Sequence, residues 1–404
     1  MAEIGESLAA AEPARVPAAG TLLSRLDKVG AVIAILAAAG LVLEPFATVK
    51  ANRIVSGRGV GLFEALPPAV AAAGLAVLVA GLLVALRRGR PGIRLAAGAI
   101  ALATLGVLIG LVPGHLVPPG NALARVSPAA GFWVLGFAFA ILVTDAIAKL
   151  ALGPAARLAV LAAAAAGLAV LLGSGLWDGL SVMREYASHA DSFWQEGGRH
   201  VALAFGSLVA AVAVGLPLGI ACHRSPSLRG VTLPVLNIIQ TIPSIAMYGL
   251  MMVPLGLLAA SVPLAADLGI RGIGTAPALI ALFLYSLLPV VANVVVGLGQ
   301  TPPEVVEAAE GMGMTGRQRL LGVELPLALP VILTGIRIVL VQNIGLVTIA
   351  ALIGGGGFGT FVFQGIGQAA TDLVLLGAVP TIALAFTAAI ILDALIEILR
   401  GHRP

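Results

Sequence analysis

The stretch TPPEVVEAAEGMGMTGRQRLLGVELPLALP, residues 301–330, lies between two long apolar segments of the chain. Thr301 before two prolines, with Glu304 three positions later, is typical of a helix N-terminus with a capping box. The glycines of the following GMG tripeptide can end this helix in a left-handed turn. Thr315 and Gln318 then predict a second capping box. We therefore predict two short capped helices that meet at a glycine elbow.

The first of these helices, predicted over residues 304–312, carries small and apolar side chains beside three glutamates. An isolated helix of this length is marginal in water, and a groove on another protein would stabilise it. The second helix is predicted over residues 316–324, with Pro326 marking the return to the next apolar segment. The pattern thus predicts a partner-binding elbow.

The composition of the whole chain points to a membrane. Of 404 residues, 59% are hydrophobic and 10% are charged, and the mean hydropathy is +1.08, whereas about 25% charged residues is normal for a soluble domain. The basic residues form no dense run, so nucleic-acid binding has little support. The single cysteine, Cys222, excludes an internal disulfide. The five histidines never cluster in the sequence, so we expect no metal site.

Ten segments are apolar and long enough to cross a bilayer, which takes about 20 residues. They cover roughly 29–47, 69–86, 95–112, 130–148, 155–173, 201–222, 234–259, 275–299, 330–352 and 374–399. With a cytoplasmic N-terminus, 15 Lys and Arg residues lie inside and 7 outside, in agreement with the positive-inside rule. The outer loop at 48–68, with three basic residues, is the weakest point of this orientation. We predict an all-α, multi-pass protein of the cell inner membrane with both termini in the cytoplasm.

The chain divides into two unlike parts. After a cytoplasmic tail, residues 1–28, an extension of about five spans at 29–173 has almost no polar residue inside the membrane. Residues 174–200 are polar and carry two tryptophans, which predicts a segment on the outer membrane interface. Residues 201–400 carry most of the polar side chains inside spans. Such residues are costly in lipid and mark pathways or helix contacts, so we expect the functional residues in this second part.

The elbow resembles the EAA loop of ATP-binding-cassette importer permeases. Glu307-Ala308-Ala309, three residues, Gly313, nine residues, Val323, one residue and Leu325-Pro326 follow the spacing of that motif. Valine replaces the isoleucine that the family usually has, which is a mild departure. The resemblance implies a loop that couples the permease to an ATPase through Glu304, Glu307, Ala308, Ala309, Gly313, Val323, Leu325 and Pro326.

A narrower resemblance covers about residues 201–399. LNIIQTIPSIAMYGLM (236–251), PALIALFLYSLLPVVANVVVGL (277–298), VELPLALPVILTGIRI (323–338) and AALIGGGGFG (350–359) are similar to permeases of osmoprotectant importers. This likeness implies a type I importer permease fold and a cargo such as glycine betaine, choline, carnitine or proline betaine. The insertion at 260–274 departs from the family pattern and leaves the outer face of the pathway in doubt.

The resemblance also implies partners. None of the three lysines lies in a G-x-x-x-x-G-K-[ST] loop, so this chain cannot itself cradle ATP phosphates. We expect ATP and Mg²⁺ on two copies of a cytoplasmic ATPase subunit, and a second permease subunit that is identical or a shorter relative. A quaternary ammonium cargo calls for an aromatic cage, and the chain has only 3 Trp and 3 Tyr. High-affinity recognition is therefore expected from a separate periplasmic binding protein.

Several polar residues are candidates for the lining of a translocation pathway. Pro243 would kink the seventh span between polar neighbours, and further amides lie in later spans. The candidates are Gln240, Thr241, Pro243, Ser244, Asn293, Gln342 and Asn343. Hydrogen bonds between packed helices are an equally good interpretation of these residues. Arg337, about two turns inside the ninth span, is expected to reach toward the cytoplasmic face.

Other functions remain open at this point. An ion-coupled secondary transporter would place carboxylates near the membrane centre, and none of the 19 acidic residues falls at the centre of the last five predicted spans. An intramembrane enzyme would need a nucleophile and base within the spans, and the sequence offers no such catalytic group. An importer of the same class for another small solute, such as an amino acid or a sulfonate, stays an alternative.

Overall fold

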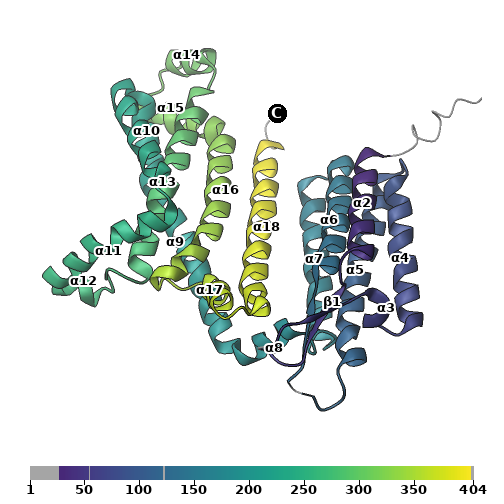
Figure 1. Ribbon diagram of the computed structural model, residues 1–404. Coiled ribbons are helices and arrows are strands. Elements are labelled where there is room, and N and C mark those ends of the chain that lie inside the picture. Colours follow the sequence, from purple (N-terminus) through teal and green to yellow (C-terminus); the bar gives the residue numbers. More distant parts are fainter. Residues whose placement is uncertain (1–26, 54, 122, 402–404) are drawn as a thin grey trace, which may run out of the picture. The chain divides into compact units, whose positions relative to one another are not determined.

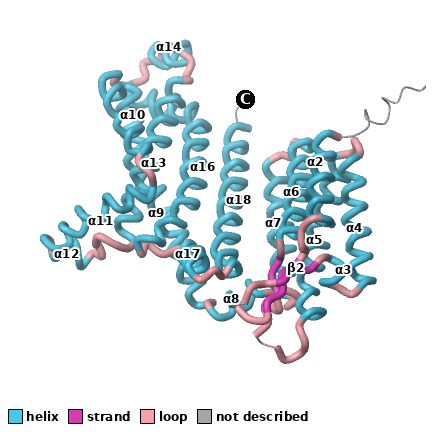
Figure 2. The backbone as a smooth tube through the Cα atoms, in the orientation of Figure 1, coloured by secondary structure: helices cyan, strands magenta, loops and turns pink. Residues whose placement is uncertain are grey.

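The computed structural model describes residues 27–401, except 54 and 122, and they form mainly helices (Figures 1 and 2). In this part of the chain, nine helices are long and apolar enough to cross a membrane. The first apolar helix, α2 (Lys28–Val42), has only 15 residues and is shorter than the predicted first span. It ends early because Pro45 disfavours helical backbone at the residue before it. The all-α fold class is confirmed, with nine long helices and this shorter one.

The described chain forms two compact units. The first contains residues up to Thr48, 58–116 and 128–151. Besides α2, its helices are α3 (Leu62–Ala65), α4 (Pro68–Leu86), α5 (Pro91–Leu116) and α6 (Ala130–Leu150). A Cβ atom on Gly30 would lie 1.9 Å from the carbonyl oxygen of Ala85. Small residues thus let these helices approach closely, as is usual between helices in lipid.

A buried charge network holds one end of the first unit together. Arg94 is 1% exposed and lies 2.9 Å from the carboxylate of Asp145 and 3.4 Å from that of Asp27. Lys149 contacts the same two carboxylates at 2.8 and 3.1 Å. Burial alone raises the pKa of Asp27, but the Gly30 N–H, Lys149 and Arg94 together hold that pKa below its usual value.

Three short strands add to the helices: β1 (Ala47–Lys50), β2 (Arg58–Val60) and β3 (Arg125–Pro128), in the order β2-β1-β3. The sequence predicts no strands in these segments. Two of the three basic residues of the predicted outer loop at 48–68 have acidic partners. Arg53 lies 3.2 Å from Glu185 within the second unit, and Arg58 pairs with Glu64 within the first.

The second unit contains residues 49–57, 117–127 and the chain from Leu152 onward. Its helices up to the elbow are α7 (Pro154–Gly173), α8 (Ser181–Ser188), α9 (Ala190–Arg224), α10 (Pro226–Thr241), α11 (Ser244–Ser261), α12 (Pro263–Asp267) and α13 (Thr275–Gly299). The elbow and the remaining chain form α14 (Pro303–Gly311), α15 (Gly316–Arg319), η1 (Leu320–Glu324), α16 (Leu325–Ala350), η2 (Ala351–Ile353), α17 (Gly359–Gly367) and α18 (Thr371–Gly401). Helix α7 contacts α18 in this unit. The structure therefore differs from the predicted extension at 29–173, which includes α7.

The predicted seventh span is broken into two helices. Helix α10 ends at Thr241, and α11 begins at Ser244 after Pro243, whose backbone is extended. The physical reason is that proline lacks an N–H and pushes Ile242 out of helical backbone. Figure 1 shows α11 and α12 leading away from the other helices of this unit. The proline is therefore a break rather than a kink within one continuous span.

The core of the second unit is built on α13. Helix α9 packs on one side of it and α16 on another. A Cβ atom on Gly215 would lie 2.7 Å from Val290, and one on Gly335 would lie 2.6 Å from Asn293. Gly215 and Gly219, four residues apart on α9, both serve close helix packing, because Gly219 meets Val294 in the same way. This packed trio positions the elbow, which connects α13 to α16.

Candidate functional site

The first helix of the elbow, α14, has its N-cap one residue later than the predicted Thr301. Its N-cap is Pro302, and within the described chain its first turn has no side-chain cap. The hydroxyl of Thr301 is buried there without a hydrogen-bond partner. Thr301 lies too early to cap because Pro302 has extended backbone and its carbonyl accepts from the Val305 and Val306 N–H groups. The capping box with Glu304 is therefore wrong.

The glycine elbow forms as predicted. Gly313 has a left-handed backbone with φ of 77°. Its N–H donates to the Glu310 carbonyl at 2.9 Å, and the Met314 N–H donates to the Ala309 carbonyl at 3.1 Å. These two bonds are the Schellman pattern that ends a helix. A left-handed backbone favours glycine strongly, so the sequence signal at Gly313 was specific.

The second helix of the elbow differs from the prediction. The capping box of Thr315 and Gln318 is present, with the Thr315 N–H donating to the Gln318 side chain at 2.8 Å. The helix then runs through a π-helical turn, η1, straight into α16. Pro326 lies in the first turn of α16, where its missing N–H is tolerated. Pro326 thus lies at the start of the next apolar helix, as predicted, but the helical backbone is not interrupted before it.

The residues of the EAA pattern lie on both sides of the elbow. Ala309 is 2% exposed and packs inward. Glu304, Glu307 and Ala308 are exposed on α14, and Met312 next to them is 74% exposed. Beyond the elbow, Val323 and Leu325 are half-buried and Pro326 is exposed. Helix α14 therefore presents an acidic surface with an apolar edge that the described residues leave uncovered.

A polar cleft of about 470 Å³ lies beside α14. Its lining includes Glu307 from α14, Arg224 from the end of α9, and Arg319 and Glu324 from the elbow. Arg224 also donates to the Gly316 carbonyl at 3.3 Å. The end of α9 is thus tied to the elbow while an open space separates it from α14.

Arg319 joins two carboxylates, and the sequence does not predict these contacts. Its Nε donates to the carboxylate of Glu324 at 2.6 Å, and its guanidinium also pairs with Glu310. Glu324 is 6% exposed and thus buried, whereas its partner Arg319 is half-buried. The five- and nine-residue spacings of these charges follow no helical period, because the glycine turn and the π-turn come between them. The sequence therefore gave little signal for the network.

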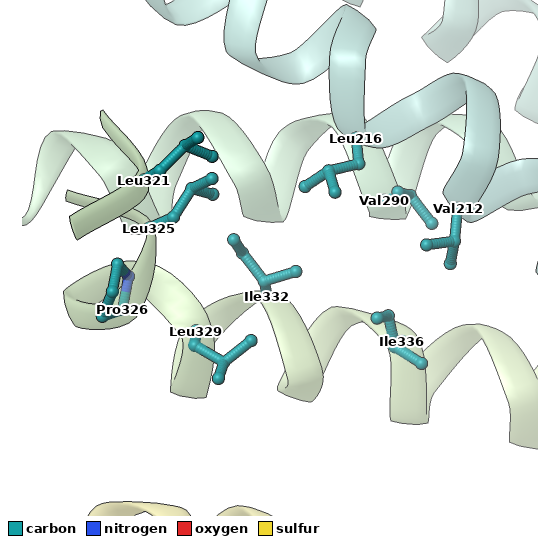
Figure 3. Close-up of a pocket in the computed structure, with 9 residues that line it drawn as sticks. All are labelled: Val212, Leu216, Val290, Leu321, Leu325, Pro326, Leu329, Ile332 and Ile336. Atoms are coloured by element: carbon teal, nitrogen blue, oxygen red, sulfur yellow. The ribbon is translucent and has the colours of Figure 1, made fainter. Parts of the chain in front are cut away.

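An apolar groove of about 380 Å³ follows the same elbow into the membrane-spanning part (Figure 3). Leu321 and Leu325 line its elbow end, and Ile332 and Ile336 continue it along α16. The remaining lining residues are Val212, Leu216, Val290, Pro326 and Leu329. Each of these side chains is apolar, so the groove offers no polar contact to a solute.

The proposed pathway residues make helix contacts in this structure. Gln240 donates to the Tyr285 carbonyl at 2.8 Å, whereas Thr241 and Asn293 bond to carbonyls of their own helices. Asn343 is fully buried. Ser244 and Gln342 are half-buried, and Pro243 is exposed at the break between α10 and α11. A pathway role stays a prediction for this set.

Arg337 does not reach toward the cytoplasmic face alone but pairs with Asp393, which joins α16 to α18. The glycine-rich stretch at 354–357 is a close-packed turn. The Gly357 N–H donates to Glu196 at 2.6 Å, and the Phe358 N–H donates to Nδ1 of His200 at 3.2 Å.

Comparison with known proteins matches both halves of the chain. Residues 211–401 match the family described as binding-protein-dependent transport system inner membrane component. Residues 27–183 match the family described as ABC transporter permease YehY, N-terminal domain.

Individual relatives match the second half. The osmoprotectant import permease protein OsmW of Salmonella typhimurium is 43% identical over 49% of this chain and 83% of its own length. The carnitine transport permease protein OpuCB of Listeria monocytogenes is 36% identical over 48% of this chain and 85% of its own length. A solved structure of the MetNI methionine ABC transporter in inward-facing conformations covers 51% of this chain and 96% of that chain, with 23% identity and a TM-score of 0.45.

Proposed function

This chain belongs to the family of binding-protein-dependent transport system inner membrane components, and from that premise we propose that it carries a small osmoprotectant across the membrane. The family consists of permease components of ATP-binding-cassette importers, and the chain is a multi-pass membrane protein of this kind. Glycine betaine, choline, carnitine and related quaternary ammonium solutes are the proposed cargo. The names of the relatives support this class of solute.

The observation that carries the proposal is the exposed elbow. Helix α14 presents Glu304 and Glu307 outward and ends at a fixed glycine turn, and η1 joins the elbow to α16 without a loop. A helix placed in this way can be held in a groove of an ATPase subunit. ATP binding would bring two ATPase subunits together, and α16 would follow α14.

The proposed assembly has two permease subunits and two ATPase subunits, which bind ATP and Mg²⁺. The second permease subunit is either another copy of this chain or a shorter relative. A periplasmic binding protein delivers the cargo to the outer face, and both termini of this chain lie in the cytoplasm. ATP drives import only because it binds the two conformations with different affinity.

The test is reconstitution in lipid vesicles. The chain is combined with the ATPase subunit and the binding protein of the proposed importer, and uptake of labelled glycine betaine, choline, carnitine and an amino acid is measured. We expect uptake of the quaternary ammonium solutes that needs ATP and both partners. Uptake by the chain alone along an ion gradient would contradict the permease assignment, and ATP-driven uptake of the amino acid alone would contradict the cargo.

A further inference from the structure

The joint between α14 and α16 contains a glycine turn and a continuous helical segment. Gly313 has left-handed backbone, and a Cβ atom built on it would meet nothing within 4 Å. Two backbone hydrogen bonds hold this turn, and open space lies beside the glycine. In contrast, α15, η1 and α16 run on as one continuous helical segment from Gly316. If only the glycine turn joined them, α14 could swing without moving α16.

Arg319 spans this joint. It lies at the end of α15, and its guanidinium pairs with Glu310 on the last turn of α14. Its Nε donates at 2.6 Å to Glu324 on η1, directly before α16. Both contacts are charge-assisted hydrogen bonds to carboxylates, which are stronger than neutral ones. The planar guanidinium has several donors in a fixed arrangement, so it can hold two carboxylates in one geometry.

The two carboxylates that contact Arg319 differ in burial and therefore in role. Glu324 is 6% exposed, whereas the side chain of Glu310 is 57% exposed. The Arg319–Glu324 contact thus belongs to the packed base of the elbow, and the Arg319–Glu310 contact reaches out to α14. Arg319, Glu310 and Glu324 together form a strut between α14 and α16. The polar cleft lies beside this strut, and Glu307 and Arg224 also line the cleft. Arg224 bonds to Gly316 on the elbow, whereas Arg319 contacts α14 itself through Glu310.

We propose that Arg319 is a positioning residue that fixes the angle between α14 and α16, so that movement of the ATPase-bound helix reaches the membrane-spanning part. This inference rests on the proposed function of the elbow as the ATPase contact. Arg319 acts through Glu310 and Glu324 and does not itself touch the solute or ATP. Without Arg319, ATP hydrolysis continues, but a smaller part of the movement of α14 in each cycle is passed on to α16.

The first test measures the angle directly and does not depend on any partner. Spin labels are placed at Val305→Cys on α14 and Ile338→Cys on α16, two exposed positions, in a Cys222→Ala background. We expect one narrow distance distribution for the otherwise unchanged chain. Glu310→Gln should broaden it, and Arg317→Gln, an exposed arginine on the same short helix, should not.

A second variant protects this test from loss of folding. Arg319→Gln alone would leave the carboxylate of Glu324 buried without its partner, which is strongly destabilising. The double variant Arg319→Gln with Glu324→Gln removes both charges and keeps the shapes. It should broaden the distance distribution as much as Glu310→Gln does. A distribution as narrow as that of Arg317→Gln in both strut variants would overturn the proposal.

The second test measures coupling in the reconstituted importer. Glu310→Gln and the double variant should retain the ATPase subunit and the KM for solute, while solute imported per ATP falls by about two- to fivefold, as expected for one partly exposed ion pair. Arg317→Gln should keep the unchanged ratio. An unchanged ratio in the strut variants would overturn the proposal for Arg319. Failure of the proposed function itself looks different, because the unchanged chain would then show no solute-coupled ATP hydrolysis.

Discussion

Three buried polar side chains meet where α9, α13 and α16 pack together. The amide of Asn343 donates to the hydroxyls of Ser207 and Ser286, both at 2.9 Å, and all three residues are fully buried. In lipid there is no water to replace these partners. The triad therefore joins three helices at one point and explains why an asparagine is retained inside a membrane span.

Replacing this amide should weaken the helix packing. Asn343→Ala removes the donor to both hydroxyls, and we expect a loss of about 1 kcal/mol in the free energy of unfolding. Unfolding of the purified chain in mixed micelles measures this loss. Gln342→Ala, at the half-buried neighbouring position, is the control and should stay within about 0.5 kcal/mol of the unchanged chain. Equal stability of both variants would refute the role of the triad.

At the residue scale, the sequence predicted local backbone chemistry better than side-chain contacts. Gly313 and the capping box of Thr315 could be predicted because each depends on residues within a few positions. The partners of Asn343 lie 57 and 136 residues away, so the sequence could only offer a pathway or a helix contact. Thr301 failed as a cap because Pro302 moved the helix start by one residue.

At the scale of the elements, close packing dominates. Gly359, at the start of α17, lies very close to the backbone of α16. A Cβ atom there would lie 1.9 Å from the Thr348 carbonyl oxygen, which is backbone and cannot move aside cheaply. We expect Gly359→Ala to give little folded protein, measured as the monodisperse fraction after extraction. Gly367→Ala, where a Cβ atom meets nothing within 4 Å, should express normally. Normal yield of Gly359→Ala would mean that α17 is less tightly held than the structure indicates.

The outward face of α14 provides a second prediction at this scale. Glu307 is exposed and makes no ion pair within the described residues, so Glu307→Lys should leave the chain inserted and stable. It should abolish transport and weaken co-purification of the ATPase subunit, because the reversed charge lies on the docking surface. Asp267→Lys, an exposed acidic residue at the end of α12, should keep both. Wild-type transport by Glu307→Lys would count against the coupling role of the elbow.

Element boundaries were predictable where proline and glycine fix them and less so elsewhere. Helix α13 has the predicted bounds, because Gly274 precedes it and Gly299 ends it. The π-turn η1 and the strands were not predicted. A π-turn of five residues has no sequence pattern of its own, and here the contact between Arg319 and Glu324 spans it.

For the molecule as a whole, the charge network of the first unit predicts a response to acid. The pKa of Asp27 is held below its usual value, so its ionised form contributes stability that is fully present above about pH 4, the unfolded value. That contribution is lost as the pH falls through the native pKa below it. At pH values under about 4, we expect the melting temperature to decrease as the pH is lowered, and to decrease less steeply in the Asp27→Asn variant. The same acid dependence in both proteins would exclude Asp27 as the titrating group.

The orientation of the chain can be tested with single cysteines in a Cys222→Ala background. Met312→Cys on the elbow should react with a membrane-impermeant thiol reagent only in inside-out vesicles. Trp194→Cys, 69% exposed near the start of α9, should react only from the outer side. The opposite pattern would place the elbow on the outer face and refute the proposed ATPase contact.

The overall organisation was largely predictable, because apolar length and charge bias are properties of whole segments. Nine of the long spans could be located from composition, although Pro243 and Pro45 changed the lengths of two segments. The likeness to known permeases depended on a few residues at fixed spacings around Glu307 and Gly313. The contact of α7 with α18 could not be foreseen, since its ion pair joins Arg157 to Glu397 across 240 residues.

The paired charges of the loop at 48–68 bear on how the chain enters the membrane. Moving one positive charge outward against an inside-negative voltage costs about 2.3 kcal/mol per 100 mV. Arg53 pairs with Glu185, and Arg58 pairs with Glu64. Moving a negative carboxylate outward is favoured by the same voltage, so each carboxylate offsets the electrical cost of one arginine. If this loop lies on the outer face as predicted, these two carboxylates would offset two of its three positive charges during translocation.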